Sequence, residues 1–252
     1  MATGLARGAK ARGKRIAFGD GRRIIWDHNS ELIFRGNPNI AAPGCEAHGD
    51  IEWVSYYKGH RIYNRHDKRS NRWVWNLDFR PTPGEVFLSM EELRAGARAG
   101  SGFVLMEPNV EGWKSVAPNK DWGRARYQAV ADRLIADGLR VVQFAYEKAG
   151  PALKGAEVLR TTSFRDALAV MRHAALYIGP EGGLHHGAAA MGRDAVVLFG
   201  GFIPASVTGY EGHANLTGGA EACGSILPCA HCRGALDAIT VGEVYAAAKE
   251  RL

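Results

Sequence analysis

The 252-residue sequence predicts a mixed α/β protein built around a parallel sheet. After about residue 100, apolar stretches of strand length alternate with stretches of helical periodicity. A glycine turn and a helix of small residues follow the apolar strand expected at residues 176–179. Alternation of this kind is typical of parallel sheets with right-handed crossovers, in which the carboxyl ends of the strands face the ligand crevice.

The elements of the second half can be placed in order. Between residues 122 and 136 the apolar positions follow helical spacing, and Gly138 ends this helix. Ser163 and Asp166 have the spacing of a capping box, which predicts a helix start. We expect strands at residues 103–106, 140–145, 157–160, 176–179 and 195–200, and helices at 122–136, 163–173 and 241–252.

The first hundred residues are less regular. Pro81, Pro83 and Gly84 interrupt the pattern, and the Gly-Ser-Gly run at 100–102 has the composition of a hinge. We expect strands at residues 15–18, 23–26, 51–63 and 72–77 and a short helix at 90–99. This organisation predicts an N-terminal lobe (1–100), a second lobe (101–236) and a C-terminal helix within 237–252.

Composition sets the broad class of protein. A hydrophobic content of 46% with 23% charged residues is ordinary for a soluble globular chain. No apolar run approaches the roughly 20 residues of a membrane-spanning helix. Residues 1–14 are basic and lack the apolar centre of a secretory signal. We therefore expect no transmembrane segment and a cytoplasmic location.

The charge is strongly basic and unevenly distributed. A net charge of +6 and an isoelectric point near 9.2 favour anionic partners, whether a nucleotide, a phosphate-rich glycolipid or a nucleic acid. A solvated surface and a binding face explain the basic clusters equally well, and alternating aromatics also occur in sheet cores. The clusters are Arg7, Lys10, Arg12, Lys14, Arg22 and Arg23, then Lys58, Arg61, Arg65, Lys68, Arg69 and Arg72, the second interleaved with Trp53, Tyr56, Tyr57, Tyr63, Trp73 and Trp75.

Four cysteines do not make a disulfide scaffold in a chain of this length. Cys223, Cys229 and Cys232 could hold zinc if Cys45 or a histidine such as His231 completed the ligand set. The usual second paired knuckle is missing from the sequence. We therefore expect reduced thiols, no metal and no cofactor.

The turn after residues 176–179 carries one carboxylate, two glycines and two histidines: Glu181, Gly182, Gly183, His185 and His186. Backbone N–H groups at a helix start bind phosphates, and glycines let them approach without side-chain obstruction. The structural alternatives are a carboxylate that complements the helix dipole, a plain tight turn and histidines that pack in the core.

Motifs of the second half occur in a fixed order. A Lys-x-Trp segment precedes a helix, and the glycine turn, an alanine-rich helix and a strand ending in Phe-Gly follow. In this sequence they are Lys120-Asp121-Trp122, Glu181-Gly182-Gly183-Leu184-His185-His186, Ala188-Ala189-Ala190 and Leu198-Phe199-Gly200. Two further segments follow along the chain, Cys229-x-x-Cys232 and Ile239-Thr240-Val241-Gly242-Glu243-Val244. This series resembles the carboxyl-terminal half of glycosyltransferase family 9, the ADP-heptose:lipopolysaccharide heptosyltransferase type. The resemblance implies a GT-B-like α/β fold of two Rossmann-like lobes, the first one reduced.

The resemblance also implies a nucleotide-diphosphate sugar donor in the second lobe and an acceptor in the first. Lys120 would neutralise the donor diphosphate, which gains charge as it leaves. Glu181 replaces the family's aspartate and would accept hydrogen bonds from donor hydroxyls, while His186 would bind phosphate or sugar. The implied donor-binding residues are Lys120, Trp122, Glu181, Gly182, Gly183, His185 and His186.

The catalytic base is harder to place. Family members typically start with a strand and a Gly-Asp loop whose aspartate is a candidate base. The start of this chain is similar to the segment after that strand, so we expect the first strand to be missing or the lobe shortened. Asp20, Asp27 and His28 are the candidates, with Glu31 beside them, and each has a structural role as its alternative.

These features predict an inverting, metal-independent glycosyltransferase that moves a sugar to a hydroxyl acceptor. No Asp-x-Asp pair stands out, which agrees with metal independence. The alternatives are a non-catalytic nucleotide-sugar or nucleic-acid binding protein, or a glycosyltransferase whose acceptor is DNA.

Overall fold

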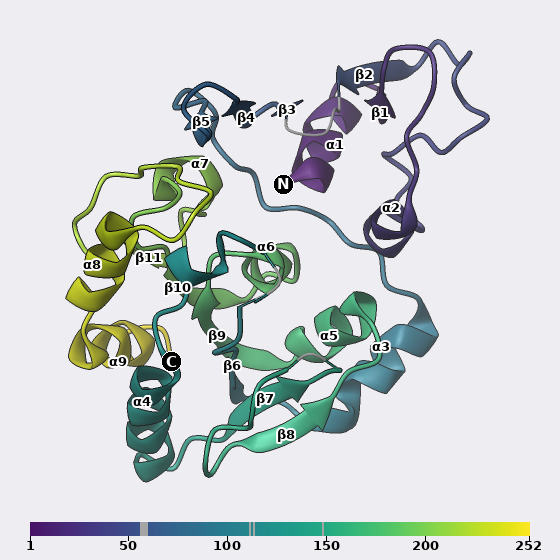
Figure 1. The fold of residues 1–252 in the computed structure, drawn as a ribbon. Coiled ribbons are helices and arrows are strands. Elements are labelled where there is room, and N and C mark those ends of the chain that lie inside the picture. Colours follow the sequence, from purple (N-terminus) through teal and green to yellow (C-terminus); the bar gives the residue numbers. More distant parts are fainter. Residues whose placement is uncertain (56–59, 111, 113, 148) are drawn as a thin grey trace.

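The computed structural model describes residues 1–55, 60–110, 112, 114–147 and 149–252 (Figure 1). The expectations for Tyr56, Tyr57 and Lys58 lie outside these residues. The helices are α1 (Ala2–Lys10), α2 (His28–Phe34), α3 (Met90–Gly96), α4 (Arg124–Ala136), α5 (Phe164–Met171), α6 (Gly183–Ala190), α7 (Ala205–Thr208), α8 (Ala230–Ala238) and α9 (Val241–Lys249), with 3₁₀ turns η1 (Ala97–Ala99) and η2 (Ala117–Asn119).

A six-stranded parallel sheet forms the second half of the molecule and confirms the predicted α/β class. Its strands lie in the order β11-β10-β9-β6-β7-β8. They are β6 (Phe103–Met106), β7 (Val141–Ala145), β8 (Glu157–Arg160), β9 (Ala174–Pro180), β10 (Asp194–Leu198) and β11 (Ala214–Leu216). Counted along the chain, this is the 3-2-1-4-5-6 order of dinucleotide-binding folds, whose direction reverses between β6 and β9.

Two hydrophobic layers enclose this sheet. Alternate residues of β6 face opposite sides, so Phe103 contributes to the layer under α5 and α6 and Val104 to the layer under α4 and α9. Figure 1 shows the helices arranged around the sheet in this way. The all-apolar strands are therefore explained, because both faces are covered.

The helix boundaries follow from local chemistry. Ser163 caps α5 by accepting a hydrogen bond from the Asp166 N–H at 3.1 Å, as its sequence spacing predicts. Gly138 has φ +80° just after α4, a conformation that favours glycine. Helix α3 packs against α5 so closely that a Cβ on Gly96 would lie 2.4 Å from the Ala169 carbonyl oxygen.

The N-terminal part holds a much smaller sheet. Strand β1 (Arg15–Gly19) pairs in parallel with β2 (Ile51–Ser55), and Ile16 makes an isolated parallel bridge to Ile40. The strand expected at residues 23–26 is wrong: there, Ile24 makes an isolated bridge to Gly19. The Asp20 carboxylate accepts hydrogen bonds from the Arg22 and Arg23 N–H groups, which closes a tight turn and prevents a second paired strand.

A third, antiparallel sheet comprises β3 (His60–Arg61), β4 (Asn64–Asp67) and β5 (Arg72–Trp75). It contacts the second half of the chain. The Trp73 N–H donates to the Gly224 carbonyl at 2.8 Å, and the Trp75 ring lies 5.8 Å from that of Phe202. Residues from both sides of the expected boundary at 100 therefore share contacts, and the division into 1–100, 101–236 and 237–252 stays a prediction.

Arg165 on α5 connects three segments. Its side chain is only 3% exposed and forms an ion pair with Glu92 on α3 at 2.6 Å. It also donates to the backbone carbonyl oxygens of Leu32 on α2 and Phe87 before α3. The Arg165 guanidinium lowers the pKa of Glu92 to about 2.

Among the described residues, no helix has both the length and the apolar character needed to cross a membrane.

Candidate functional site

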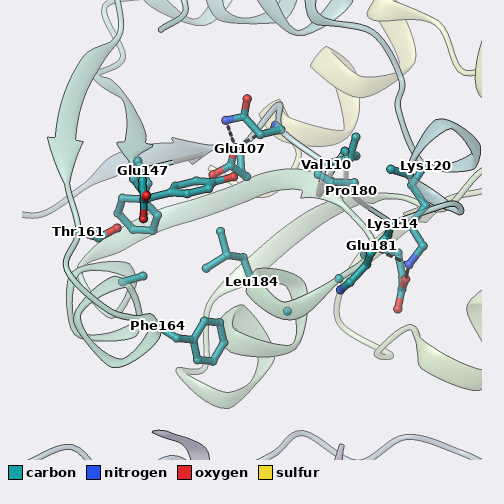
Figure 2. A pocket seen from close by; sticks show the side chains of 18 of the residues that line it. Glu107, Val110, Lys114, Lys120, Glu147, Thr161, Phe164, Pro180, Glu181 and Leu184 are labelled. Atoms are coloured by element: carbon teal, nitrogen blue, oxygen red, sulfur yellow. Dashed lines mark hydrogen bonds and ion pairs between the residues drawn. The ribbon is translucent and has the colours of Figure 1, made fainter. Parts of the chain in front are cut away.

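A cavity of about 840 Å³ opens at the carboxyl ends of the six-stranded sheet (Figure 2). Its walls come from the segments after β6, β7, β8 and β9 and from the start of α6. It therefore lies at the point where the strand order reverses, the usual ligand site of such sheets. Lys120, Glu181, Gly182 and Gly183 line it, as the sequence predicts for a ligand crevice.

Lys120 and Glu181 form a buried ion pair. The Lys120 ammonium contacts the Glu181 carboxylate and lies 5.3 Å from the ring centre of Phe202. The Glu181 side chain is 5% exposed. Burial, the largest single influence, raises the pKa of Glu181, but the charge of Lys120, the nearby His185 and hydrogen bonds from Lys120 and Thr208 together outweigh it and lower the pKa. The site thus holds the Lys120 ammonium group beside an ionised Glu181 carboxylate.

The start of α6 presents backbone to the cavity. Gly182 is the N-cap of α6 and Gly183 its first residue, and both line the cavity. A Cβ on Gly182 would have no atom within 4 Å, so the space beside its backbone is open. Unpaired N–H groups at the first turn of a helix, together with the helix dipole, attract anions.

The two histidines differ in environment. His185 is fully buried among His186, Phe199, Tyr210 and His213, with ring centres 4.8–5.6 Å away. His186 contacts the Tyr210 hydroxyl through Nδ1 at 3.0 Å and lies 3.7 Å from Glu181 through Nε2. Burial lowers the pKa of both rings, so both are neutral at pH 7. His186 lies beside Glu181, whereas His185 packs in the core.

Trp122 also belongs to the core. Its side chain is 1% exposed, its Nε1 donates to the Ile239 carbonyl at 2.9 Å, and its ring meets Tyr127 edge-on. Among the described residues that line the cavity, Trp122, His185 and His186 do not appear. The structure places Trp122 where it anchors the segment that carries Lys120.

The candidate bases hold local structure in the N-terminal part. Asp20 closes the turn after β1, and Asp27 caps α2 by accepting from the Ser30 N–H at 2.8 Å. Backbone hydrogen bonds lower the pKa of both aspartates, which makes them weaker bases. Glu31 accepts from the Trp26 indole N–H at 3.1 Å, and His28 begins α2. None of the four is among the described residues lining the cavity, so their catalytic role stays a prediction.

Sequence reasoning missed Glu107. This residue follows β6 directly, as Glu181 follows β9, and its side chain lines the cavity while being 4% exposed. Burial raises the pKa of Glu107 to about 7, against hydrogen bonds from Asn109 that lower it. Its place at a strand end was the signal in the sequence that could have identified it.

Three cysteines converge elsewhere, between the loop before α8 and the start of α8. The Cys223 Sγ lies 3.4 Å from that of Cys232 and 3.9 Å from that of Cys229. All three sulfurs are within 4.8 Å of one another, close enough to bind one metal ion. Cys45 instead contacts Arg15 in the N-terminal part, and His231 contacts the Glu221 carbonyl.

A comparison with models of known protein families identifies the family of this chain. A model of glycosyltransferase family 9 (heptosyltransferase) matches residues 75–239. The chain belongs to glycosyltransferase family 9. This family 9 protein matches no curated protein.

Solved structures show the same fold at low sequence identity. TibC, an iron-containing dodecameric glycosyltransferase from enterotoxigenic E. coli H10407, is 14% identical, with a TM-score of 0.58 and coverage of 98% of this chain and 70% of that one. A family 9 glycosyltransferase from Veillonella parvula DSM 2008 is 15% identical, with a TM-score of 0.53 and coverage of 98% and 76%. E. coli ADP-heptose lps heptosyltransferase II is 19% identical, with a TM-score of 0.49 and 71% of this chain covered. The family 9 chain spans about half (54%) of that enzyme's length. The similarity to TibC and to the Veillonella parvula protein confirms the GT-B-like fold.

Proposed function

We propose that this chain transfers a sugar from a nucleotide-diphosphate sugar to a hydroxyl acceptor. The observation that carries the proposal is the cavity at the strand-order reversal, where a partly buried lysine and the glycine start of α6 lie together. Both features favour a diphosphate. TibC has been solved in complex with ADP-D-β-D-heptose, which supports an ADP-linked sugar as the donor class here.

The cavity volume of about 840 Å³ leaves room for the rest of such a donor. Beyond Lys120 and Glu181 it extends past Leu184 to Phe164, Thr161 and Glu147 (Figure 2). An apolar and aromatic wall suits a nucleobase, and hydroxyl and carboxylate groups suit a ribose. We therefore place the diphosphate at the Lys120 end and the nucleoside at the other.

Transfer would proceed by inversion without a metal in the donor site. The acceptor oxygen forms a bond to the anomeric carbon while the bond from that carbon to the diphosphate oxygen breaks. The proton of the acceptor hydroxyl passes to a base in the N-terminal part, where Asp20, Asp27 and His28 are the proposed groups. Lys120 and the α6 N–H groups stabilise the charge that the leaving diphosphate gains.

The acceptor is proposed to be anionic, a glycolipid or a nucleic acid. Exposed Arg65, Lys68, Arg69 and Arg72 lie on or beside the small sheet of β3, β4 and β5. Their charge would attract a phosphate-bearing acceptor, and such binding would weaken with salt.

The donor site is tested by binding. We would measure ADP and ADP-glucose binding to wild type, Lys120→Ala and the matched control Lys154→Ala, whose lysine is exposed and outside the cavity lining. Loss of one charged hydrogen-bond donor should weaken binding by about 1.5–3 kcal/mol in Lys120→Ala alone. Equal affinity of Lys120→Ala and wild type would refute the donor-site assignment.

A specific observation also favours a binding protein without catalysis: the candidate bases are engaged in a turn and a helix cap. Release of free sugar from ADP-glucose, or its transfer to an added acceptor, would establish catalysis. Donor binding without either reaction would favour the binding protein.

We infer further that Cys223, Cys229 and Cys232 hold a structural metal ion. TibC is described as iron-containing, and three convergent sulfurs are a donor set that suits iron or zinc. The backbone of Cys232 hydrogen-bonds the Cys229 sulfur and lowers the pKa of Cys229, whereas burial raises the pKa of Cys232. Such an ion would fix the loop before α8 to α8 and supply no step of the transfer.

Metal analysis of the purified chain tests this inference. We expect close to one equivalent of iron or zinc, lost in Cys229→Ser and retained in the control Cys45→Ser. Metal content that is unchanged in Cys229→Ser would contradict it.

A further inference from the structure

A second carboxyl group lies at the strand-order reversal. Glu107 follows β6, its backbone N–H donates to the Ile178 carbonyl of β9 at 2.9 Å, and its side chain lines the cavity. In Figure 2 it lies between the Lys120 and Glu181 end and the Glu147 and Thr161 end. The proposed donor site therefore contains two acids on neighbouring strands, β6 and β9.

The two acids differ in their partners. Glu181 has Lys120 against it, whereas no ion pair is found for Glu107 among the described residues. The Glu107 Oε1 accepts hydrogen bonds from the Asn109 N–H at 2.9 Å and from its side-chain amide. The Oε2 is buried and has no partner within the described part of the chain. A buried carboxylate oxygen without a donor is costly, which favours the neutral acid.

Two buried phenols near Glu107 do not titrate near neutral pH. Burial raises the pKa of Tyr177 on β9 and of Tyr127 on α4 well above the usual value. Both phenols therefore stay neutral near pH 7. The other titratable or charged groups of the cavity wall are Lys114, Lys120, Tyr146, Glu147, Arg160 and Glu181.

We propose that Glu107 binds the donor as a neutral carboxylic acid, its side chain turning in the cavity wall so that the acid O–H donates a hydrogen bond to an oxygen of the diphosphate. This inference rests on the donor site proposed above. An ionised Glu107 would repel a diphosphate in the same crevice, whereas the neutral acid satisfies its own unpartnered oxygen on a strong acceptor. Glu107 would then keep its proton for as long as the donor is bound.

A pH dependence with a definite sign follows. In the protein without donor, the Glu107 carboxyl group has a pKa of about 7, and a bound anion raises that pKa further. Well below pH 7 the acid is already neutral and affinity is constant. Above pH 7 the protein must take up one proton from solution for each donor molecule bound, and affinity falls by about tenfold per pH unit.

Calorimetric titration with ADP-glucose tests the proposal. Its diphosphate is a diester, so the charge of the probe is constant between about pH 6 and 9. At pH 8, titrations in buffers of different ionisation enthalpy should show uptake of nearly one proton by wild type. Glu107→Gln keeps the acceptor for Asn109 and offers an N–H in place of the acid O–H. It should bind with an affinity that does not change with pH and take up no proton.

The matched control is Glu147→Gln, an exposed carboxylate on the wall of the same cavity. Whatever its affinity, it should retain the proton uptake of wild type. Uptake that persists in Glu107→Gln, or is missing from wild type, would overturn the role of Glu107. The proton uptake of wild type on ADP-glucose binding needs no variant, so it tests the role of Glu107 even if Glu107→Gln folds poorly. Failure of ADP-glucose to bind at any pH would instead refute the donor site itself.

Discussion

At the scale of single residues, the site depends on how its two glutamates are neutralised. Glu181 has a cation beside it, whereas burial raises the pKa of Glu107 to about 7. Sequence reasoning identified Glu181 because the glycine turn draws attention to it. Glu107 follows a strand without any motif, and its significance comes from burial and from an unpartnered oxygen, which only three-dimensional packing creates.

Removal of Lys120 should destabilise the fold as well as weaken binding. Lys120→Met leaves the buried Glu181 without a cation, and we expect a loss of about 3 kcal/mol in the free energy of unfolding at pH 7. Denaturant titration measures it. The double variant Lys120→Met/Glu181→Gln should recover most of the loss, whereas Lys154→Met should change little. A double variant no more stable than Lys120→Met would contradict this account.

At the scale of helices and strands, the second half was predictable and the first was not. Strands β6 to β10 were expected within two residues of their observed bounds, because continuous apolar runs between helices leave few alternatives. Strands β4 and β11 and helices α2, α7 and α8 were not expected. Strands β4 and β11 and helices α2 and α7 are short, so each offers few residues in which a periodic pattern could be recognised.

The contact between α3 and α5 provides a prediction at this scale. Gly96→Ala should destabilise the protein by about 1–3 kcal/mol, although alanine favours helices, because its Cβ would meet the Ala169 backbone. The control Gly234→Ala on α8 meets no atom within 4 Å and should stabilise by up to about 1 kcal/mol. Thermal unfolding of both variants tests the pair, and stabilisation by both would show that α3 and α5 pack less tightly.

At the scale of the whole molecule, Arg165 and Glu92 connect the N-terminal part to the large sheet. Arg165 bonds to α2, α3 and the segment before α3 from a single buried position on α5. The sequence contained no signal for this connection, since the two residues are separated by 73 positions. Long-range ion pairs of this kind follow from the fold and cannot be read from local spacing.

Acid should break this connection. The pKa of Glu92 is lowered from 4.5 to about 2, so its contribution to stability is present above about pH 4.5 and is lost as the pH falls towards 2. Glu92→Gln should therefore cost about 2–3 kcal/mol at pH 7 and almost nothing at pH 2. Denaturant titrations at both values measure the difference. The exposed neighbour Glu91 is the control, and Glu91→Gln should show no such pH dependence.

The small sheet of β3, β4 and β5 has a consequence for engineering. Although it precedes residue 100, its Trp73 backbone pairs with Gly224 and its Trp75 ring packs on Phe202. A chimera that joins two family members at the Gly-Ser-Gly run of 100–102 would therefore separate surfaces that fit each other. A swap that also transfers residues 60–75 would keep each Trp75 with its own Phe202. The boundary for exchanging parts between relatives follows contacts in space, and it crosses the chain more than once.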